Sequence, residues 1–355
     1  MININRTFTV IGVMSGTSGD GLDIACSRYY KKNQKWFFEI LKAETFLYPK
    51  SLKTSFKEVF NKTKSLEDID KVLGYFISEK ILQFLTKNNL KIDLIGSHGH
   101  TIFHDPKNGY TCQIGAGSVI SKTVNVPVVS NFRQQDIDLG GQGAPLVPIG
   151  DRLLFSEYEA CLNLGGIANI SFEKNGNRIG YDICPCNILL NFLAQIDGKE
   201  FDEKGVLASR GVVNTKLMDH LNNINYYSRS YPKSLGREDV DLLFMPLVDI
   251  MNVEIEDLLC TIVEHIALQI GVSCIQNNLS NILITGGGVY NDYLLERIDY
   301  HTNAKIVVPS PSIIEYKESI IFGFLAVLRI LNKKNCLAST TGASIDHCSG
   351  DLYLN

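Results

Sequence analysis

The chain has 355 residues, enough for two domains, because single hydrophobic cores stop growing at about 250–300 residues. Hydrophobic residues make up 45% and charged residues 20%, the composition of an ordinary soluble globular protein. A formal net charge of −4, with no run of lysines or arginines, argues against a nucleic-acid partner.

The nine cysteines are scattered and none forms a Cys-x-x-Cys pair, so free thiols in a reducing cytosol are favoured over a disulfide framework. Cys184 and Cys186 are poorly spaced for a tetrahedral zinc site, and we predict no metal bound by protein ligands alone. The N-terminus lacks an apolar leader, and the longest apolar run, 320–328, is too short to span a bilayer. We therefore expect a cytoplasmic protein with no membrane partner.

An apolar strand over 7–14 enters a glycine-rich turn, and a second strand over 22–30 leaves it, which predicts a β-hairpin. Backbone N–H groups of a glycine turn can approach an anion closely, and Thr17 and Ser18 add hydroxyl donors. Asp20 or Asp23 could lie near a hydrated Mg²⁺. The turn suits phosphates, although a tight turn without a ligand fits the pattern equally well.

A third strand is predicted over 36–43, and Ser65, followed by Asp68, predicts the N-cap of a helix that continues to about residue 85. A strand over 90–95 leads into Ser97-His98-Gly99-His100, at the strand end where ligands of α/β sheets bind. A further strand over 124–129 leads into Asn131-Phe132-Arg133. The sequence Gly140-Gly141-Gln142-Gly143-Ala144-Pro145 indicates a loop or a domain crossover.

The opening pattern returns at residue 160. A strand over 161–164, the turn Gly165-Gly166, a strand over 167–172, a polar turn and a strand over 179–183 follow one another. Residue identity between the halves is low, so the repeat is one of pattern only. Two related α/β halves around a cleft are the economical interpretation, since small-molecule sites favour domain interfaces.

Helices are predicted over 187–196, 254–276 and 315–331. His265 falls among apolar positions of the second, as a packed or surface histidine does. A strand over 281–285 ends in Gly286-Gly287-Gly288, which indicates either a flat surface for a nucleotide base or a tight strand–helix junction. Glu318 is predicted near the start of the last helix, where the helix dipole favours a carboxylate.

These pieces, in this order, resemble the anhydro-N-acetylmuramic acid kinases of the acetate and sugar kinase/Hsp70/actin superfamily, and the resemblance covers nearly the whole chain. Each motif is weak alone, but the ordered set is specific. The motifs are Met14-Ser15-Gly16-Thr17-Ser18 with Asp20-Gly21, Ser97-His98-Gly99, Asn131-Phe132-Arg133 with Asp136, Gly140 to Pro148, Asn163 to Asn169, Pro232-Lys233-Ser234 with Gly236-Arg237-Glu238, and Gly286-Gly287-Gly288.

The resemblance implies two ribonuclease H-like α/β domains with mixed sheets around a central cleft for ATP and substrate. Domain I would comprise 1–130 plus about 312–355, with the phosphate loop and part of the sugar site. Domain II would comprise 131–311, with the catalytic aspartate and the glycines beside adenosine. The oligomeric state is open, and a homodimer is one possibility.

The resemblance also implies an ATP- and Mg²⁺-dependent enzyme of cell-wall recycling. It would open the 1,6-anhydro ring of anhydro-N-acetylmuramic acid with water and phosphorylate O6. The family's catalytic aspartate falls on Asp182, and its substrate-side glutamate falls on Glu318. His98, Arg133 and Gln142 are the expected sugar contacts, with Mg²⁺ held through ATP and water. The expected ATP contacts are Gly16, Thr17, Ser18, Gly19, Asp20, Gly21, Leu22, Asp23, Gly286, Gly287 and Gly288.

The chain departs from the family pattern beside the expected base, where Ile183, Cys184 and Cys186 replace a threonine and two glycines. Gly19 stands where leucine is common, and His100 where glutamine is common. Three alternatives follow: a kinase for another sugar, a catalytically impaired protein that binds ATP or muropeptide, and redox control through the two cysteines. Asp182 could also be an acid that caps the helix over 187–196.

Overall fold

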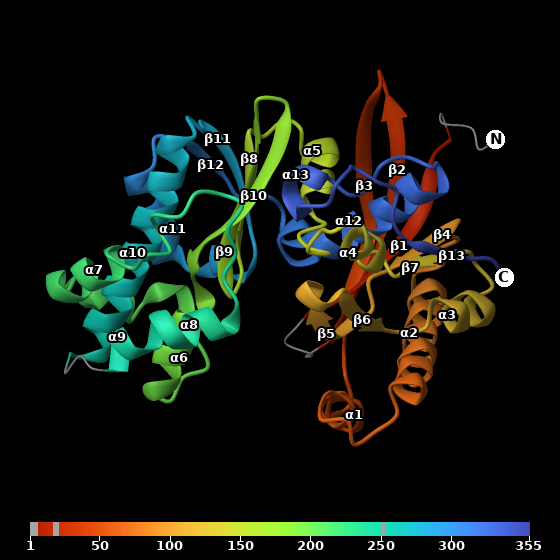
Figure 1. The fold of residues 1–355 in the computed structure, drawn as a ribbon, viewed down its shortest axis with the longest axis horizontal. Helices are drawn as coiled ribbons and strands as arrows, with labels where there is room; N and C mark the ends of the chain where they lie inside the picture. The colour runs from red at the N-terminus through yellow and green to blue at the C-terminus, as the bar shows by residue number, and fades with distance from the viewer. Residues whose placement is uncertain (1–5, 17–20, 250–252) are drawn as a thin grey trace. The chain divides into compact units, whose positions relative to one another are not determined.

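The computed structural model describes residues 6–16, 21–249 and 253–355. The chain forms two compact units, the first comprising Met1–Leu154 and Tyr316–Asn355 and the second Phe155–Glu315 (Figure 1). Domain boundaries were expected after residue 130 and near residue 311, whereas the segment 131–154 packs within the first unit. Its Asp136 accepts a hydrogen bond from Thr341, and its Asp151 forms an ion pair with Lys317.

Unit 1 is built on a mixed sheet whose described strands run in the order β13-β7-β4-β1-β2-β3. The pairs β1–β2 and β2–β3 are antiparallel, whereas β1–β4 and β4–β7 are parallel. Without the edge strand β13, this is the ribonuclease H-like order 3-2-1-4-5. The strands are β1 (Phe8–Ser15), β2 (Gly21–Lys32), β3 (Lys35–Leu47), β4 (Leu94–Ser97), β7 (Val128–Ser130) and β13 (Asp351–Tyr353), with a separate hairpin of β5 (His100–Asp105) and β6 (Tyr110–Ile114).

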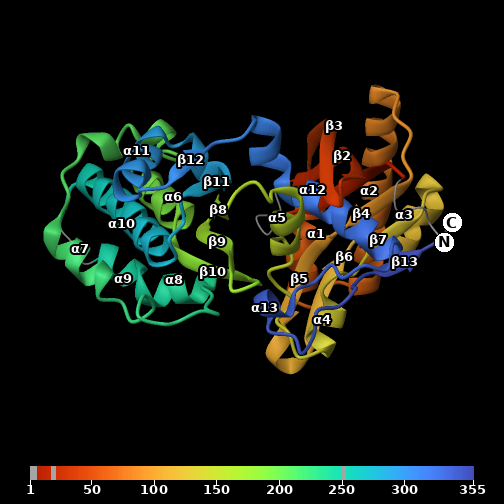
Figure 2. The same ribbon diagram turned by 90° about the horizontal axis from the view of Figure 1, so that it is seen from above.

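Alternation along β1 decides what each face of the sheet contacts. Ile11 and Val13 belong to the apolar core that includes Leu73 and Ile77 of α2. Gly12 faces the other way, and α12 crosses the sheet there, as Figure 2 shows. The helices of this unit are α1 (Lys50–Phe60), α2 (Leu66–Asn88), α3 (Gly117–Val124), α4 (Gln134–Asp138), α5 (Pro148–Leu154) and α13 (Ala338–Thr341), a 3-10 turn at Pro106–Asn108, and most of α12 (Pro311–Ile330).

Unit 2 repeats the same strand order, since its described strands run β10-β9-β8-β11-β12. The pairs β8–β9 and β9–β10 are antiparallel, and β11 pairs in parallel with β8 and β12. The predicted repeat is therefore confirmed at the level of topology. The strands are β8 (Ala160–Leu164), β9 (Ile167–Lys174), β10 (Asn177–Pro185), β11 (Asn281–Thr285) and β12 (Lys305–Val307).

The core of unit 2 gathers around α10 (Ile255–Gln276), which packs against α6 and α11 (Figures 1 and 2). Among the described residues, α10 is the one helix long and apolar enough to cross a membrane, and 72% of its apolar window is buried in the protein, as in a core helix. The other helices are α6 (Asn187–Ile196), α7 (Thr215–Asn222), α8 (Arg237–Leu243), α9 (Met245–Asp249) and α11 (Asp292–His301), with 3-10 turns at Glu203–Gly205, Ala208–Arg210 and Gly287–Tyr290.

Several expected elements have different bounds. The predicted strand over 124–129 is wrong in its first half, because Val124 ends α3 and β7 begins only at Val128. Glu318 is not near a helix start, because α12 already begins at Pro311, a residue whose missing N–H suits the first helical turn. The N-cap at Ser65 is confirmed, since its hydroxyl accepts a hydrogen bond from the Asp68 N–H.

Candidate active site

Asp182 lies at the end of β10, where the pairing with β9 shifts register between Asp182 and Cys184. Its side chain is half-buried, and Oδ2 accepts a hydrogen bond of 2.9 Å from the backbone N–H of Leu235. Burial raises the pKa of this carboxyl to about 6, and the Leu235 hydrogen bond opposes the shift. No side chain caps α6, whose N-cap is Cys186, so Asp182 is not a helix cap.

The loop that supplies this hydrogen bond also fixes the backbone of Asp182. The Asp182 N–H donates to the carbonyl of Lys233 over 3.2 Å, and its carbonyl accepts from the Tyr226 hydroxyl. The Lys233 ammonium lies over the Tyr226 ring, 4.6 Å from its centroid, and burial lowers its pKa. The sequence marked this loop as a motif without assigning it a role, and its place beside Asp182 comes from the tertiary structure.

The residues that replace the motif threonine and glycines point into the core of unit 2. Ile183, Cys184 and Cys186 are at most 3% exposed and belong to its main apolar cluster. Burial raises the pKa of both thiols, so they stay protonated at neutral pH. The two cysteines therefore occupy core volume, whereas the Asp182 carboxyl keeps access to solvent.

The run Gly286–Gly288 follows β11 at the same sheet edge as Asp182, because β8, β10 and β11 all end there. Gly286 has a φ of +88°, and a Cβ atom added there would lie 2.6 Å from Asn163 Oδ1. Gly287 is exposed, and an added Cβ atom would meet only Asn187 Nδ2, at 3.9 Å. An open backbone surface of this kind fits a flat nucleotide base.

In unit 1, the expected phosphate turn is only partly described, because Thr17, Ser18, Gly19 and Asp20 lie outside the described residues. Gly16 follows β1, and Gly21, Leu22 and Asp23 begin β2. Asp23 is half-buried, and its Oδ1 accepts a hydrogen bond of 2.6 Å from the Thr45 hydroxyl. This carboxylate fits the oxygen ligands or water contacts that Mg²⁺ prefers.

His100 supports the start of this turn, a role that sequence reasoning missed. Its Nδ1 lies 2.9 Å from the Ser15 hydroxyl, and the ring also hydrogen-bonds the backbone of Gly16. The ring stacks on Phe56 with 4.5 Å between centroids. The departure from glutamine at this position therefore keeps a hydrogen-bonding side chain against the strand end.

Arg133 and His98, predicted as separate sugar contacts, bind each other. The Arg133 Nε–H donates to His98 Nε2 over 2.9 Å, and Nη1 donates to the Gly143 carbonyl over 2.7 Å. His98 is 4% exposed, and its Nδ1 lies 3.0 Å from the Gly99 carbonyl. Burial and the Arg133 charge hold the pKa of His98 well below its usual value, so the ring is neutral. The neutral ring donates from Nδ1 and accepts at Nε2, which orients the guanidinium.

Glu318 is exposed on α12, yet protein around its carboxyl withholds hydration and raises its pKa, while the charges of Arg133 and Lys317 oppose the rise. The charge of Asp23 also acts on this carboxyl, so Asp23, Arg133 and Glu318 share one region of unit 1. Gln142 is exposed, and its backbone N–H donates to the Thr341 carbonyl over 2.8 Å. Unit 1 therefore gathers polar side chains suited to hydroxyl, amide and carboxylate groups of a ligand.

Two units of ribonuclease H-like strand order, each with a glycine turn on its first hairpin, define a protein of the acetate and sugar kinase/Hsp70/actin class. A profile of the anhydro-N-acetylmuramic acid kinase family matches residues 8–355. The chain belongs to the anhydro-N-acetylmuramic acid kinase family.

Curated relatives agree with this assignment. The anhydro-N-acetylmuramic acid kinases of Crocosphaera subtropica and Aliivibrio fischeri are each 33% identical to this chain, and each alignment covers 97% of the chain and 98% of the relative. Among solved structures, a ROK family glucokinase from Streptomyces griseus aligns over 90% of this chain and 99% of its own, at 12% identity and a TM-score of 0.42. At that distance we draw nothing from the glucokinase.

Proposed function

We propose that the chain carries out the reaction of its family with Asp182 as the general base. It is a kinase that hydrolyses the 1,6-anhydro ring of anhydro-N-acetylmuramic acid and phosphorylates O6, giving N-acetylmuramic acid 6-phosphate and ADP. The observation that carries the assignment of the base is the Asp182 carboxyl, half-buried, with a pKa raised to about 6 and one oxygen held by the Leu235 N–H. A base with a pKa near the operating pH is efficient at moving protons.

Ring opening and phosphorylation together need only one carboxylate, Asp182. Asp182 takes one proton from a water molecule, and the resulting hydroxide forms a bond to C1 of the sugar while the C1–O6 bond breaks. O6 then forms a bond to the γ-phosphorus of ATP while the bond from that phosphorus to the β,γ-bridging oxygen breaks and releases ADP. Asp182 returns its proton to solvent. Inverting glycosidases need a second carboxylic acid to protonate the leaving oxygen, whereas here phosphorylation captures that oxygen.

The remaining residues bind and orient. Arg133, held by His98 and Gly143, carries a fixed cation for the carboxylate of the sugar, and Glu318 and Gln142 offer acceptors and donors for its hydroxyl and amide groups. The turn from Gly16 to Asp23 would hold the phosphates of ATP, and Gly286–Gly288 would border the adenosine. Mg²⁺, bound through ATP, water and an acid such as Asp23, would neutralise charge during phosphoryl transfer.

The buried thiols of Cys184 and Cys186 support an active enzyme over a catalytically impaired homologue, because neither side chain fills the solvent side of Asp182. All nine cysteines are free, in keeping with a reducing compartment. We therefore propose a cytoplasmic enzyme with a small-molecule sugar substrate. A homodimer stays a prediction.

Asp182→Asn tests the proposal, because the amide keeps the shape and cannot accept the proton. We expect turnover to fall by about 10²–10⁴-fold, with ATP affinity nearly unchanged. The assay follows formation of the sugar 6-phosphate by mass spectrometry with ATP, Mg²⁺ and anhydro-N-acetylmuramic acid. Asp197→Asn, at the exposed end of α6, is the control and should keep full activity. Full turnover by Asp182→Asn would remove Asp182 from its assigned role.

A further inference from the structure

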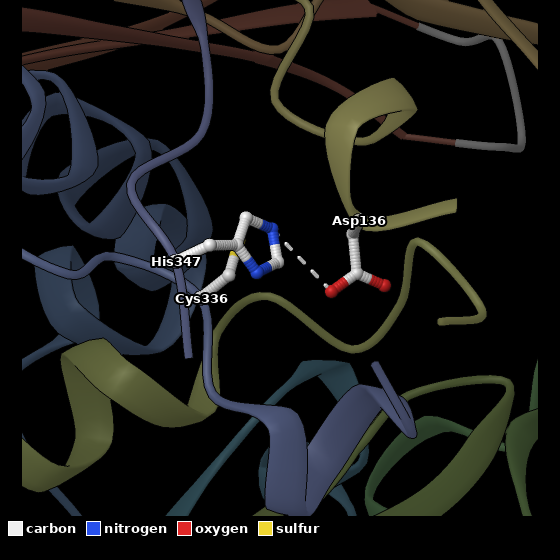
Figure 3. A group of neighbouring side chains, drawn as sticks. All are labelled: Asp136, Cys336 and His347. Atoms are coloured by element: carbon white, nitrogen blue, oxygen red, sulfur yellow. Dashed lines mark ion pairs between the residues drawn. The ribbon is translucent and has the colours of Figure 1, made fainter. Parts of the chain in front are cut away.

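Three side chains from separate parts of the sequence meet inside unit 1. Asp136 lies on α4, Cys336 follows α12, and His347 belongs to the C-terminal segment. One potential ligand atom from each lies within 4.8 Å of the others, and all three residues are buried. In Figure 3, His347 and Asp136 point toward one another, with Cys336 beside the imidazole. We call this group the Asp136–Cys336–His347 cluster.

The backbone holds two of these residues directly opposite each other. Cys336 and His347 form an antiparallel bridge, closed by hydrogen bonds of 3.1 Å and 3.2 Å between their own N–H and carbonyl groups. Directly opposite residues of an antiparallel pair place their side chains on the same face. The thiol and the imidazole are therefore presented together, without help from either side chain.

The carboxylate of Asp136 is fixed just as firmly. Oδ1 accepts a hydrogen bond of 2.7 Å from the Thr341 hydroxyl, and Oδ2 accepts one of 2.8 Å from the Gly143 N–H. Asp136 is completely buried. Each carboxylate oxygen has two lone pairs, so Oδ1 keeps one for a further partner.

The imidazole has one nitrogen without a hydrogen-bond partner. Nδ1 lies 3.2 Å from the Ile345 carbonyl, which can only accept, so Nδ1 carries the hydrogen. In the neutral ring, Nε2 then presents a lone pair toward Asp136 Oδ1, 3.6 Å away. Nε2 has no hydrogen-bond partner among the described residues, although His347 is only 5% exposed. Two facing lone pairs in a buried site call for a cation between them.

We propose that the Asp136–Cys336–His347 cluster binds a divalent transition metal of the zinc type. A thiolate, an imidazole and a carboxylate are the ligands zinc takes, whereas Mg²⁺ and Ca²⁺ prefer oxygen alone. Zinc bond lengths and tetrahedral angles place ligand atoms roughly 3.3–3.6 Å apart, so the 3.6 Å between Nε2 and Oδ1 fits. The three ligand atoms lie within 4.8 Å of one another, so the Cys336 thiolate would move closer to the other two ligands on metal binding. The fourth ligand would be water.

The metal would join the C-terminal segment to α4, which begins directly after Arg133. The spacing of 200 residues between Asp136 and Cys336 hides this cluster in the sequence, where no protein-bound metal was expected. Burial raises the pKa of the Cys336 thiol, but coordination to a metal removes the thiol proton outright. Metal binding at this cluster does not depend on the proposed reaction, so the two can fail separately.

The experiment uses the full chain, freed of metal by dialysis against a chelator and then titrated with Zn²⁺ in competition with a chromophoric chelator. We expect one tightly held equivalent of zinc. Replacement by Co²⁺ is expected to give a thiolate-to-cobalt charge-transfer absorption in the near ultraviolet, a readout that needs no variant. Cys336→Ser and His347→Gln should each weaken zinc binding by at least about 100-fold.

Cys348→Ser is the matched control, because Cys348 lies in the same C-terminal segment and contacts the Arg329 carbonyl instead. It should bind zinc as the unaltered chain does. Circular dichroism checks that each variant folds. The proposal is overturned if the unaltered chain holds no zinc. Two ring protons on His347 by NMR would then identify the cluster as an imidazolium–carboxylate pair. Survival of the cobalt absorption in Cys336→Ser would also overturn it.

Discussion

The pKa of Asp182 is set by its burial and by its hydrogen bond with the Leu235 N–H. Half-burial alone would disfavour the carboxylate, and the Leu235 N–H offsets part of that cost by stabilising the charged form. The balance leaves the pKa at about 6, low enough for the ionised form to dominate at neutral pH. The motif predicted which residue this is, but its pKa depends on a loop more than fifty positions away.

The raised pKa of Asp182 predicts that activity falls at acidic pH. Above pH 6 Asp182 is ionised and can accept a proton, and below it the carboxyl is protonated and cannot. We expect kcat/KM to fall about tenfold for each pH unit below this value. Assays between about pH 5 and 8 should show the acidic limb. The residual activity of Asp182→Asn should lack this limb, and a flat profile down to pH 5 would contradict the assignment.

His98 is expected to position Arg133 rather than to contact the sugar itself. His98→Leu removes the acceptor that holds the Arg133 Nε–H, so the guanidinium loses its fixed orientation. We expect the KM for the sugar to rise by about 10-fold or more, since hydrogen bonds to charged groups contribute about 1.5–3 kcal/mol. The KM for ATP should stay unchanged, and steady-state kinetics with each substrate varied in turn provide the measurement.

Two further variants sharpen this comparison. His98→Gln restores an acceptor near the position of Nε2 and should recover part of the lost affinity. His220→Leu, an exposed histidine of α7, should leave both KM values unchanged. Equal rises in both KM values for His98→Leu would indicate general damage to the fold, and the positioning role would be rejected.

At the scale of elements, the crossing of α12 over the sheet is set by glycines. A Cβ atom at Gly12 would lie 1.7 Å from the Ser319 carbonyl oxygen, and one at Gly96 would lie 2.3 Å from that of Phe322. The Tyr29 hydroxyl adds a hydrogen bond of 2.6 Å to the Ile320 carbonyl. Glu318 is carried on this closely packed helix, so its place depends on residues that contain no side chain.

Gly12→Ala should therefore destabilise the protein, because the methyl group collides with backbone, which cannot rotate away. We expect a loss of about 3 kcal/mol or more in the free energy of unfolding, the upper end for overpacking. Denaturant titration followed by circular dichroism measures it. Gly166→Ala is the control, since an added Cβ atom there would meet Ile188 only at 3.8 Å. A stability equal to that of the unaltered chain would show that α12 shifts freely.

Helices with a long apolar period were predicted with nearly correct bounds, whereas short elements were predicted poorly. The helix over 187–196 has the predicted bounds, and α10 begins one residue later than expected. The hairpin of β5 and β6 was not predicted, because its short strands carry no strong apolar alternation. The helix α1 was not predicted either, although Leu52, Phe56 and Val59 follow the helical period. His265 on α10, expected to be either packed or at the surface, is buried; it hydrogen-bonds the Tyr227 hydroxyl over 2.7 Å, and burial lowers its pKa to about 3.

At the scale of the whole molecule, the chain builds the same five-strand order twice. In unit 1 that order is extended by β13, which pairs with β7, so residues from both ends of the sequence complete one sheet. The chain first passes from unit 1 into unit 2 directly after α5. Asp151 of α5 forms an ion pair with Lys317 of α12. Pairings of this kind explain why 131–154 packs with unit 1.

Local patterns in the sequence predict the repeated strand–turn–strand arrangement, the glycine turns, the family, and Asp182 as the expected base. These features are encoded over a few neighbouring residues, by alternation, helical period and turn chemistry. Long-range packing brings His98 to Arg133 and His100 to Gly16, and it brings Asp136, Cys336 and His347 together. Apart from the Cys336–His347 pair, each of these contacts joins residues at least 35 positions apart, and the packing of distant elements, which no local pattern encodes, brings them together.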